Sequence, residues 1–488
     1  MNTIEPYAWP RIGDFIGRDG ELARLESWWG ASERMPVNLY GRRRVGKSWL
    51  FRRFAHEKPA ILLVAERLAE GTQLTRFAEQ LAPALGGVTP DLPDVAALFR
   101  VLYRLARDEK VLAVIDEFPW LLGTSERAVE QNLSAVQAVM EEERDRSQLK
   151  LVVCGSAIAQ MEALQSEKNP LHGRLVPLEL RALPYGRAIE FLENEDPLDR
   201  FTRYAIAGGM PRYLAALSGG TLEDRVCDQM LKPDAPLWNE GRTIVGQELR
   251  EPAVYFSLLE QLASGEKEVG ELASAIRKGS APVAKYLSQL EDLRLVKRDL
   301  PYGASATDRR GRWVLVDPFL RFWFRFVFPF QADLEAGLSA EDLYRSEIGP
   351  ELAHHVSPVF EGACREHVRS TMGAQATRVD RWWGIALNSF RKTGERSTEE
   401  IDVVGSVRKR VTVVGEVKWT TRPAGERLLH DLHTYKIPAL QQAGIKLAGN
   451  PVVVLFSRSG YTPELVRQAG ENDDLVLVDV AAMLSTHK

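Results

Sequence analysis

A glycine-rich stretch near the N-terminus has the spacing of a loop that binds phosphate groups. It reads GRRRVGKS over residues 41–48 and fits the pattern G-x-x-x-x-G-K-[ST]. Glycines let backbone N–H groups turn toward a β-phosphate, the lysine places a charge on the β and γ oxygens, and the serine hydroxyl is a ligand for Mg²⁺. The expected nucleotide-binding residues are Gly41, Arg42, Arg43, Arg44, Val45, Gly46, Lys47, Ser48 and Trp49.

Two acidic residues end an apolar run, VLAVIDEFPWL (residues 111–121), that is typical of a buried strand. Ligands collect at the carboxyl ends of the strands in a parallel sheet. We therefore expect Asp116 beside the phosphates, where it would orient the water shell of Mg²⁺, and Glu117 as the group that polarises the attacking water. The run LKLVVCGSAIAQM predicts another strand, and Ser156 at its end could sense the γ-phosphate.

Arg174, in the segment NPLHGRLVPLELRALP, is a further candidate for phosphate chemistry. Its guanidinium could stabilise the negative charge of the transition state, either within the chain or across a subunit boundary. The second arrangement requires a dimer or a ring and the first does not, so the sequence leaves the oligomeric state open.

Length and composition indicate a globular chain that carries these residues on several domains. The chain has 488 residues, 45% hydrophobic and 27% charged, with a formal net charge of −4, so any contact with nucleic acid would come from a local basic patch. The three cysteines lack the spacing of a zinc site or a disulfide framework. The N-terminus, MNTIEPYAWPRIGDF, does not have the pattern of a secretory signal, and the apolar stretch FLRFWFRFVFPF is too short to span a bilayer. We expect a soluble cytoplasmic protein without membrane contacts.

The order of the motifs resembles that of archaeal-type AAA+-like P-loop ATPases over about residues 10–330. The motifs are FIGRDGELARLESW, the phosphate loop, IDEFPWLL, LVVCGSAIAQM, LHGRL and AGGMPRYL. The resemblance implies that the nucleotide is ATP and that the chain hydrolyses it. It also implies that Ile16, Gly17 and Arg18 help to hold the adenine and that Pro211, in a helical lid, packs near the base.

The middle of the chain resembles a winged-helix domain. Three helix-length segments follow Glu251, and two strand-like pieces, KRDLPY and GRWVLVDP, flank the loop SATDRR. Basic residues predominate: Arg277, Lys278, Lys285, Arg294, Lys297, Arg298, Arg309, Arg310 and Arg312. They could contact DNA phosphates, or the module could pack against other protein. For the next segment, DPFLRFWFRFVFPF, we favour docking between domains over stacking on bases.

The C-terminal part carries a second constellation of charged residues. Asp402 begins an apolar strand, and Glu416 and Lys418 lie on one face of the next strand because side chains alternate with a period of two. Two carboxylates and a lysine can hold Mg²⁺ and support phosphodiester cleavage, with Glu361 as a further ligand or an orienting residue. The spacing D-x₁₃-E-V-K resembles the core of the PD-(D/E)XK nuclease superfamily.

The predicted fold class is α/β, with four domains. Residues 1–180 would form the P-loop ATPase core on a parallel sheet, 181–245 the helical lid, 246–330 the winged helix and 331–488 an α/β domain like that of restriction endonucleases. The function that we predict is ATP hydrolysis coupled to action on DNA and to a metal-dependent nuclease-like domain. The alternative is a signalling or assembly ATPase in which the winged helix and the C-terminal domain bind proteins.

Overall fold

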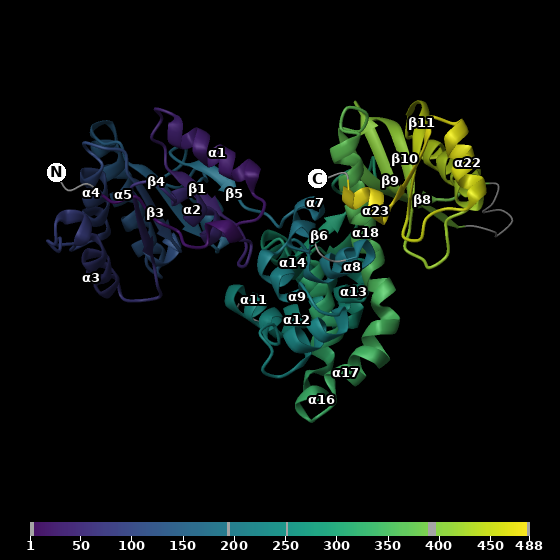
Figure 1. Ribbon diagram of the computed structural model, residues 1–488, viewed down its shortest axis with the longest axis horizontal. Helices are drawn as coiled ribbons and strands as arrows, with labels where there is room; N and C mark the ends of the chain where they lie inside the picture. Colours follow the sequence, from purple (N-terminus) through teal and green to yellow (C-terminus); the bar gives the residue numbers. More distant parts are fainter. Residues whose placement is uncertain (1–3, 193–195, 250–251, 389–396, 486–488) are drawn as a thin grey trace. The chain divides into compact units, whose positions relative to one another are not determined.

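The computed structural model describes residues 4–192, 196–249, 252–388 and 397–485, which fold into two compact units (Figure 1). Unit 1 comprises Met1–Leu183 and Met210–Arg212, and unit 2 comprises Pro184–Gly209 and Tyr213–Lys488. The first boundary lies three residues beyond the predicted end of the ATPase core at residue 180. The finer division of the remaining chain into lid, winged helix and C-terminal domain stays a prediction.

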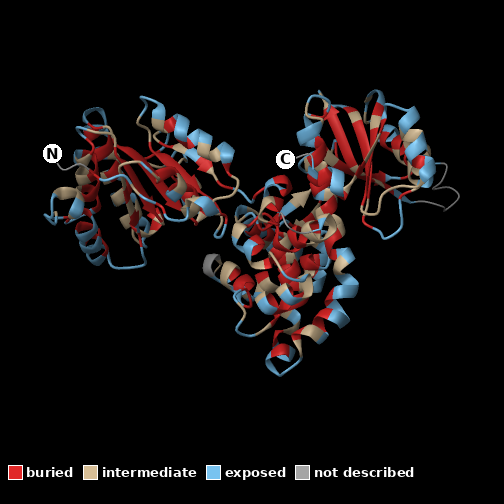
Figure 2. Ribbon diagram, in the orientation of Figure 1, coloured by how far each residue is buried: buried red, intermediate tan, exposed pale blue. Residues whose placement is uncertain are grey.

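Unit 1 is built on a five-stranded parallel sheet with the strand order β2-β3-β4-β1-β5. The strands are β1 (Val37–Tyr40), β2 (Ala60–Val64), β3 (Leu112–Asp116), β4 (Lys150–Gly155) and β5 (Val176–Glu179). All residues of β1, β3 and β4 are buried, which explains why these segments are continuous apolar runs rather than alternating ones. Figure 2 shows these strands as the buried centre of the unit.

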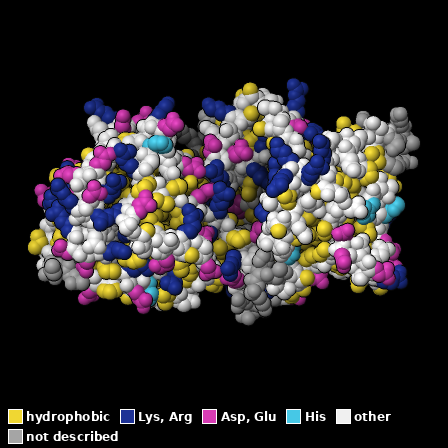
Figure 3. Space-filling view, turned by 90° about the horizontal axis from the view of Figure 1, so that it is seen from above, with side chains coloured by type: hydrophobic (Ala, Val, Ile, Leu, Met, Phe, Trp, Pro, Cys, Tyr) yellow, Lys and Arg dark blue, Asp and Glu magenta, His cyan; other side chains and the backbone are white. Residues whose placement is uncertain are grey.

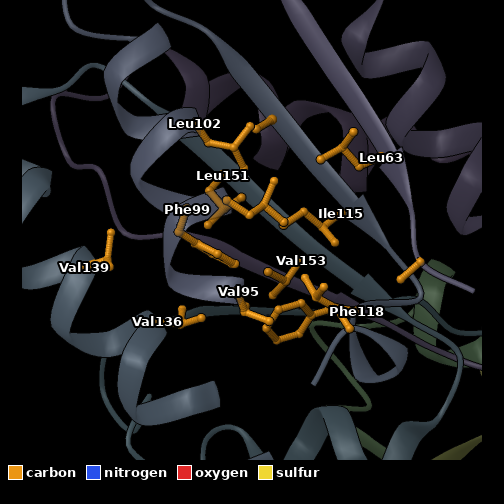
Figure 4. Close-up of a cluster of buried hydrophobic side chains, with 14 of the residues drawn as sticks. Leu63, Val95, Phe99, Leu102, Ile115, Phe118, Val136, Val139, Leu151 and Val153 are labelled. Atoms are coloured by element: carbon orange, nitrogen blue, oxygen red, sulfur yellow. The ribbon is translucent and has the colours of Figure 1, made fainter. Parts of the chain in front are cut away.

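Helices cover both faces of this sheet. They are α1 (Asp19–Gly30), α2 (Lys47–Ala55), α3 (Glu70–Leu81), α4 (Val95–Leu105), α5 (Glu126–Glu143) and α6 (Ile158–Ala163). On one face, side chains of β2, β3 and β4 form a single apolar cluster with those of α3, α4 and α5 (Figure 4). Asp94 and Ser125 cap α4 and α5 by accepting backbone N–H groups, which fixes where these helices begin.

The first half of unit 2 is helical. Its helices include α7 (Tyr185–Ala188), α8 (Pro197–Ala207), α10 (Leu222–Val226), α11 (Glu240–Glu248), α15 (Pro318–Phe322), α16 (Gln331–Glu335), α17 (Ala340–Leu343) and α18 (Gly349–Thr371). Helix α9 (Pro211–Leu217) begins in unit 1 and continues in unit 2. The aromatic segment is α15 and the π-helical turn Trp323–Val327, where most of the side chains are buried. This burial confirms that the segment packs inside the protein and does not present a surface for stacking bases.

Three helices and a two-stranded hairpin lie in the segment of unit 2 for which the sequence predicts a winged helix, and that assignment stays a prediction. Helices α12 (Pro252–Ala263), α13 (Val269–Ala275) and α14 (Ser280–Asp292) precede an antiparallel hairpin of β6 (Val296–Asp299) and β7 (Arg312–Leu315). A β-bridge between Lys267 and Trp313 ties the connection after α12 to the hairpin. Buried Val283, Leu287 and Leu290 recur at helical spacing along α14, as the sequence predicts.

The C-terminal part of unit 2 forms a mixed sheet with the order β12-β11-β10-β9-β8. The strands are β8 (Arg378–Ile385), β9 (Thr398–Val407), β10 (Arg410–Lys418), β11 (Leu447–Ser457) and β12 (Leu475–Asp479). Strands β8, β9 and β10 pair antiparallel, and β10, β11 and β12 pair parallel. Helix α18 contacts β8, β9 and β10, and the other helices are α20 (Glu426–Asp431), α21 (Ile437–Gln442), α22 (Pro463–Glu471) and α23 (Val480–Ser485).

None of the helices formed by the described residues has the length and apolar character needed to cross a bilayer. The three cysteines, Cys154, Cys227 and Cys364, are buried free thiols, which agrees with the absence of disulfide and zinc spacing in the sequence.

Candidate nucleotide site and C-terminal carboxylate cluster

The glycine-rich stretch forms the turn between β1 and α2, as the motif predicts. A side chain at Gly41 would place its Cβ 2.2 Å from the carbonyl oxygen of Leu180, so only glycine fits there. Gly46, with φ of +99°, precedes the first turn of α2, and Arg44 is also left-handed with φ of +68°. The backbone between Gly41 and Gly46 therefore reverses within six residues at the carboxyl end of a central strand.

Lys47 is buried at the start of α2 and directs its ammonium back into the loop. Its Nζ donates hydrogen bonds to the carbonyl oxygens of Gly41 (2.7 Å) and Arg42 (3.1 Å). Burial lowers the pKa of Lys47, while the carboxylates of Glu117 and Asp116 act in the opposite direction. The ammonium is thus held among the atoms of the loop by neutral carbonyl groups that a phosphate oxygen can replace.

Ser48 and Asp116 come together at the ends of their elements. The Ser48 hydroxyl donates to Oδ2 of Asp116 at 3.1 Å, and the other oxygen of Asp116 accepts the backbone N–H of Glu117 at 3.0 Å. A hydroxyl beside a carboxylate is a pair of hard oxygen ligands, which fits the preference of Mg²⁺. The roles of Ser48 and Asp116 at Mg²⁺ stay a prediction.

Glu117 and Ser156 lie side by side at the ends of β3 and β4. The Ser156 hydroxyl is 2.9 Å and 3.0 Å from the two carboxylate oxygens of Glu117, and the Ser156 N–H approaches one of them at 3.4 Å. Glu117 has a left-handed backbone, with φ of +52°, which costs a residue with a side chain about 1 kcal/mol or more. The strained backbone and the serine together fix the direction of this carboxylate.

Of the segment Ile16, Gly17 and Arg18, the arginine contacts the phosphate loop. The buried guanidinium of Arg18 donates to the carbonyl oxygens of Val45 (2.8 Å) and Arg181 (2.7 Å), so this residue braces the loop. Trp49, on the first turn of α2, packs its ring edge-on against that of Trp9, with 5.1 Å between the ring centroids. The role of these residues at the adenine stays a prediction.

Pro211 lies beside the phosphate loop, in the short segment Met210–Arg212 that belongs to unit 1. A Cβ added at Gly46 would lie 3.7 Å from Cγ of Pro211, and both residues belong to unit 1. The AGGMPRYL motif therefore places a proline beside the last glycine of the loop.

The structure does not bring Arg174 to the phosphate loop. Arg174 precedes β5, which runs parallel to β1 with Val176 opposite Val37, so it lies at the amino edge of the sheet. The loop follows Tyr40 at the carboxyl edge. The guanidinium instead pairs with Glu141 at 2.6 Å. The expectation of a contact within the chain is wrong for this structure, and the contact across a subunit boundary stays a prediction.

The C-terminal constellation gathers around Glu416, which lies in the middle of the mixed sheet and is 1% exposed. Asp402 on β9 accepts the backbone N–H of Val417 at 2.9 Å, and Lys418 approaches Glu416 Oε2 at 3.4 Å. Burial and the charge of Asp402 raise the pKa of Glu416 to about 7, and burial together with Asp402 does the same for Glu361 on α18. The residues that the D-x₁₃-E-V-K spacing selects are therefore neighbours in space.

A lysine that the sequence analysis did not select completes this cluster. Lys436 Nζ lies 2.6 Å from Glu416 Oε1, so both carboxylate oxygens of Glu416 face an ammonium group. Within the part of the chain that the structure describes, no three His, Cys, Asp or Glu side chains are placed to hold a metal ion together. The predicted metal ligands Glu361, Asp402 and Glu416 thus do not assemble into a metal site in this structure. Residue spacing gave no signal for Lys436, which is 20 residues from Glu416.

Comparison with known proteins assigns the first part of the chain. Residues 15–217 match a family described as an ATPase domain predominantly from Archaea. The chain contains an archaeal-type ATPase domain. The fold of the Walker-type ATPase of Pyrococcus abyssi agrees: it aligns over 64% of this chain and 96% of that chain, with 18% identity and a TM-score of 0.50. The glycine-rich turn lies within the residues that match this family.

The comparisons also extend beyond the ATPase domain. Residues 323–429 match a family described as archaea bacterial proteins of unknown function. The uncharacterized protein MJECL04 of Methanocaldococcus jannaschii is 24% identical over 413 residues, which covers 83% of this chain and 87% of that protein. A chain of similar length thus carries related sequence on both sides of the boundary between the two units.

Proposed function

We propose that this protein is an ATPase whose turnover responds to DNA bound by unit 2. The observation that carries the ATPase half is the set of contacts at the carboxyl edge of the parallel sheet. Lys47, the Ser48–Asp116 pair and the Glu117–Ser156 pair all lie there, at the ends of β1, β3 and β4. Catalysis of phosphoryl transfer depends on positioning and charge, and this edge supplies both.

Each residue of this edge has a separate task in the proposed mechanism. The loop amides and Lys47 bind the β- and γ-phosphates, and Ser48 and Asp116 would hold Mg²⁺, which supplies positive charge to the same oxygens when bound. Glu117 orients the attacking water and takes up its proton, because its carboxylate is the remaining base at this edge. Ser156 holds that carboxylate in place and would sense whether a γ-phosphate stands beside it.

The DNA half of the proposal is supported by exposed basic residues on α14 and just before it. Arg277 and Lys278 are exposed in the connection that precedes α14, and Lys285 is exposed on the helix, together with small residues that would let a helix approach a groove. Figure 3 shows basic and acidic side chains interspersed over much of the face in view. A local basic helix in a chain of net charge −4 is the pattern expected of a small phosphate-binding patch.

The hairpin β6–β7 is the less favourable DNA-binding element, because its basic residues have protein partners. Arg298 donates to the carbonyl oxygens of Ala306 and Asp308, and Arg310 pairs with Asp308 at 2.7 Å. Arg312 pairs with Glu266 at 3.3 Å, and the Trp383 indole N–H donates to the carbonyl of Arg310 at 3.3 Å. Arg298, Arg310 and Arg312 are therefore less available to DNA than the basic residues beside α14.

Transmission between ATP and DNA is proposed to run through the segment Met210–Arg212. These three residues cluster with unit 1 while the chain on both sides of them clusters with unit 2. A displacement of Pro211 by a change at Gly46 would be passed covalently into α9. Substituting Pro211 with glycine should weaken the response of ATP hydrolysis to DNA.

The experiment is ATP turnover measured with and without duplex DNA, beside a direct DNA-binding titration at several salt concentrations. In the double variant Arg277→Glu/Lys285→Glu, we expect weaker DNA binding and no stimulation of ATP hydrolysis by DNA, while basal turnover is unchanged. The slope of log affinity against log salt concentration should fall in magnitude by about two. Arg146→Glu, an exposed charge reversal in unit 1, is the matched control.

An alternative is an assembly or signalling ATPase whose unit 2 binds proteins, which is favoured by the protein contacts of the hairpin. Wild-type protein that hydrolyses ATP, binds no DNA at low salt and shows no DNA response would establish that alternative. Metal-dependent cleavage is not part of the proposal, because the carboxylates around Glu416 do not fit a metal ion in this structure.

A further inference from the structure

Every carboxylate of the C-terminal cluster is already engaged by a group of the protein. Glu416 faces the ammonium groups of Lys436 at 2.6 Å and Lys418 at 3.4 Å. One oxygen of Asp402 accepts a backbone N–H, and Glu361 lies 4.0 Å from the guanidinium of Arg365. Mg²⁺ binds through one or two carboxylates and retains several waters, and here four of the six oxygens of these three carboxylates lie near a nitrogen atom of the protein.

A specific backbone feature places Lys436. The residue ends a π-helical turn, Leu432–Lys436, in which the N–H of Ile437 bonds to the carbonyl of Leu432 five residues earlier. Pro438 follows directly, and a proline ring clashes with the carbonyl four residues before it, here that of Thr434. The wider turn relieves this clash, and its extra residue changes the direction in which Lys436 leaves the helix. The π-helical turn, together with its packing against the sheet, therefore sets the direction of Lys436.

The ion pair between Lys436 and Glu416 is well protected from water. The side chain of Lys436 is 16% exposed and that of Glu416 is 1% exposed, whereas Lys418 is 40% exposed. Separating a buried pair leaves an uncompensated charge, so such pairs persist even when they add little net stability. Lys418 alone would leave one oxygen of Glu416 without a cation.

We propose that the Lys436 ammonium takes the place of a divalent cation at Glu416, so that this nuclease-like sheet does not bind Mg²⁺ or Mn²⁺ there. The lysine acts as a tethered monovalent counter-ion that keeps the carboxylate cluster closed. Removal of the ammonium leaves the carboxylates of Glu416, Asp402 and Glu361 close together without the Lys436 cation. Their negative charge then favours binding of a metal ion. The inference does not depend on DNA binding or on ATP hydrolysis.

The test is a titration of the nucleotide-free full-length protein with Mn²⁺, followed by electron paramagnetic resonance of the free ion. Wild type and Glu416→Gln are expected to bind Mn²⁺ alike. Lys436→Met is expected to gain one site per chain with an affinity at least about tenfold above any wild-type binding. The double variant Lys436→Met/Glu416→Gln should lose that site, and Lys446→Met, which removes an exposed lysine before β11, should behave as wild type.

Two results would overturn the proposal. One is a wild-type Mn²⁺ site that disappears in Glu416→Gln, because a metal would then bind despite the lysine. The other is a Lys436→Met protein with the circular dichroism spectrum of wild type that binds no more Mn²⁺ than Lys446→Met. If Lys436→Met does not fold, Lys436→Gln replaces it, and the comparison of wild type with Glu416→Gln decides the first point without either variant.

Discussion

The P-loop and the Glu416 cluster use similar residue types at the ends of buried strands, yet they differ in what their lysines contact. Lys47 donates to neutral backbone carbonyls, whereas Lys436 donates to a buried carboxylate. A phosphate can displace a carbonyl from an ammonium at little cost, but separating a buried ion pair leaves a charge without a partner. One site is thus arranged to receive an anionic ligand, and the carboxylate at the other is already neutralised by a lysine of the protein.

The largest effect is expected at Glu117, the proposed base of the nucleotide site. Glu117→Gln keeps the size and hydrogen-bonding capacity of the side chain but cannot accept the proton of the attacking water. We expect kcat for ATP hydrolysis to fall by about 10²- to 10⁴-fold, with ATP binding retained. Single-turnover hydrolysis and nucleotide titration measure the two quantities separately, and unchanged turnover would remove Glu117 from the mechanism.

A smaller effect is expected when the partner of that base is removed. Ser156→Ala deletes the hydroxyl that contacts both oxygens of Glu117, so the carboxylate samples other directions. Turnover should fall roughly tenfold with little change in KM for ATP, since misplacement of a catalytic group affects the chemical step. Ser166→Ala, an exposed serine of the same unit, is the control. A change confined to KM would instead indicate a role in binding.

The Glu416 cluster can be compared with Glu366, another buried carboxylate of unit 2. Glu366 on α18 accepts the backbone N–H of Tyr185 at 3.1 Å. Burial raises the pKa of Glu366 to about 7, although the Tyr185 N–H and the charge of Arg369 each lower it. An acid with a raised folded-state pKa adds stability below its unfolded pKa near 4.5, and this contribution is lost as the pH rises through 7.

The free energy of unfolding of unit 2 should therefore fall by up to about 1.4 kcal/mol per pH unit from this group between pH 5 and 7. Glu366→Gln should flatten that slope, because the amide oxygen still accepts the Tyr185 N–H and does not titrate. Urea unfolding followed by tryptophan fluorescence at pH 5, 6 and 7 measures the slope, with Glu464→Gln on the surface of α22 as the control. Equal slopes in Glu366→Gln and wild type would show that burial of Glu366 is not costly.

A feature is predictable from the sequence when the residues that determine it lie close together along the chain. The P-loop is contiguous, so its residues, its strand and its helix are all predictable. Glu117 and Ser156 are predictable as strand ends, although their mutual hydrogen bonds are not. The position of Arg174 could have been foreseen, because a residue that precedes a parallel strand lies at the opposite edge of the sheet from the P-loop.

Lys436 could not be foreseen in the same way. Its direction depends on the π-turn before Pro438 and on the packing of that turn against the sheet. The two strands that carry Asp402 and Glu416 were predicted, and so was their proximity, but the charge that fills the cluster comes from a helix without a recognisable pattern. A motif thus identifies the carboxylates and does not establish which cation they hold.

The most direct test of this account is a calorimetric titration of ATP with Mg²⁺ into the wild-type protein and into Lys47→Met. The account predicts uptake of one ATP per chain by wild type and an affinity lower by about 10²-fold or more in a folded Lys47→Met protein, because the ammonium that would neutralise the β and γ oxygens is gone. Folded wild-type protein that takes up no ATP, or equal affinities in the two proteins, would contradict the central claim that this loop is the ATP site.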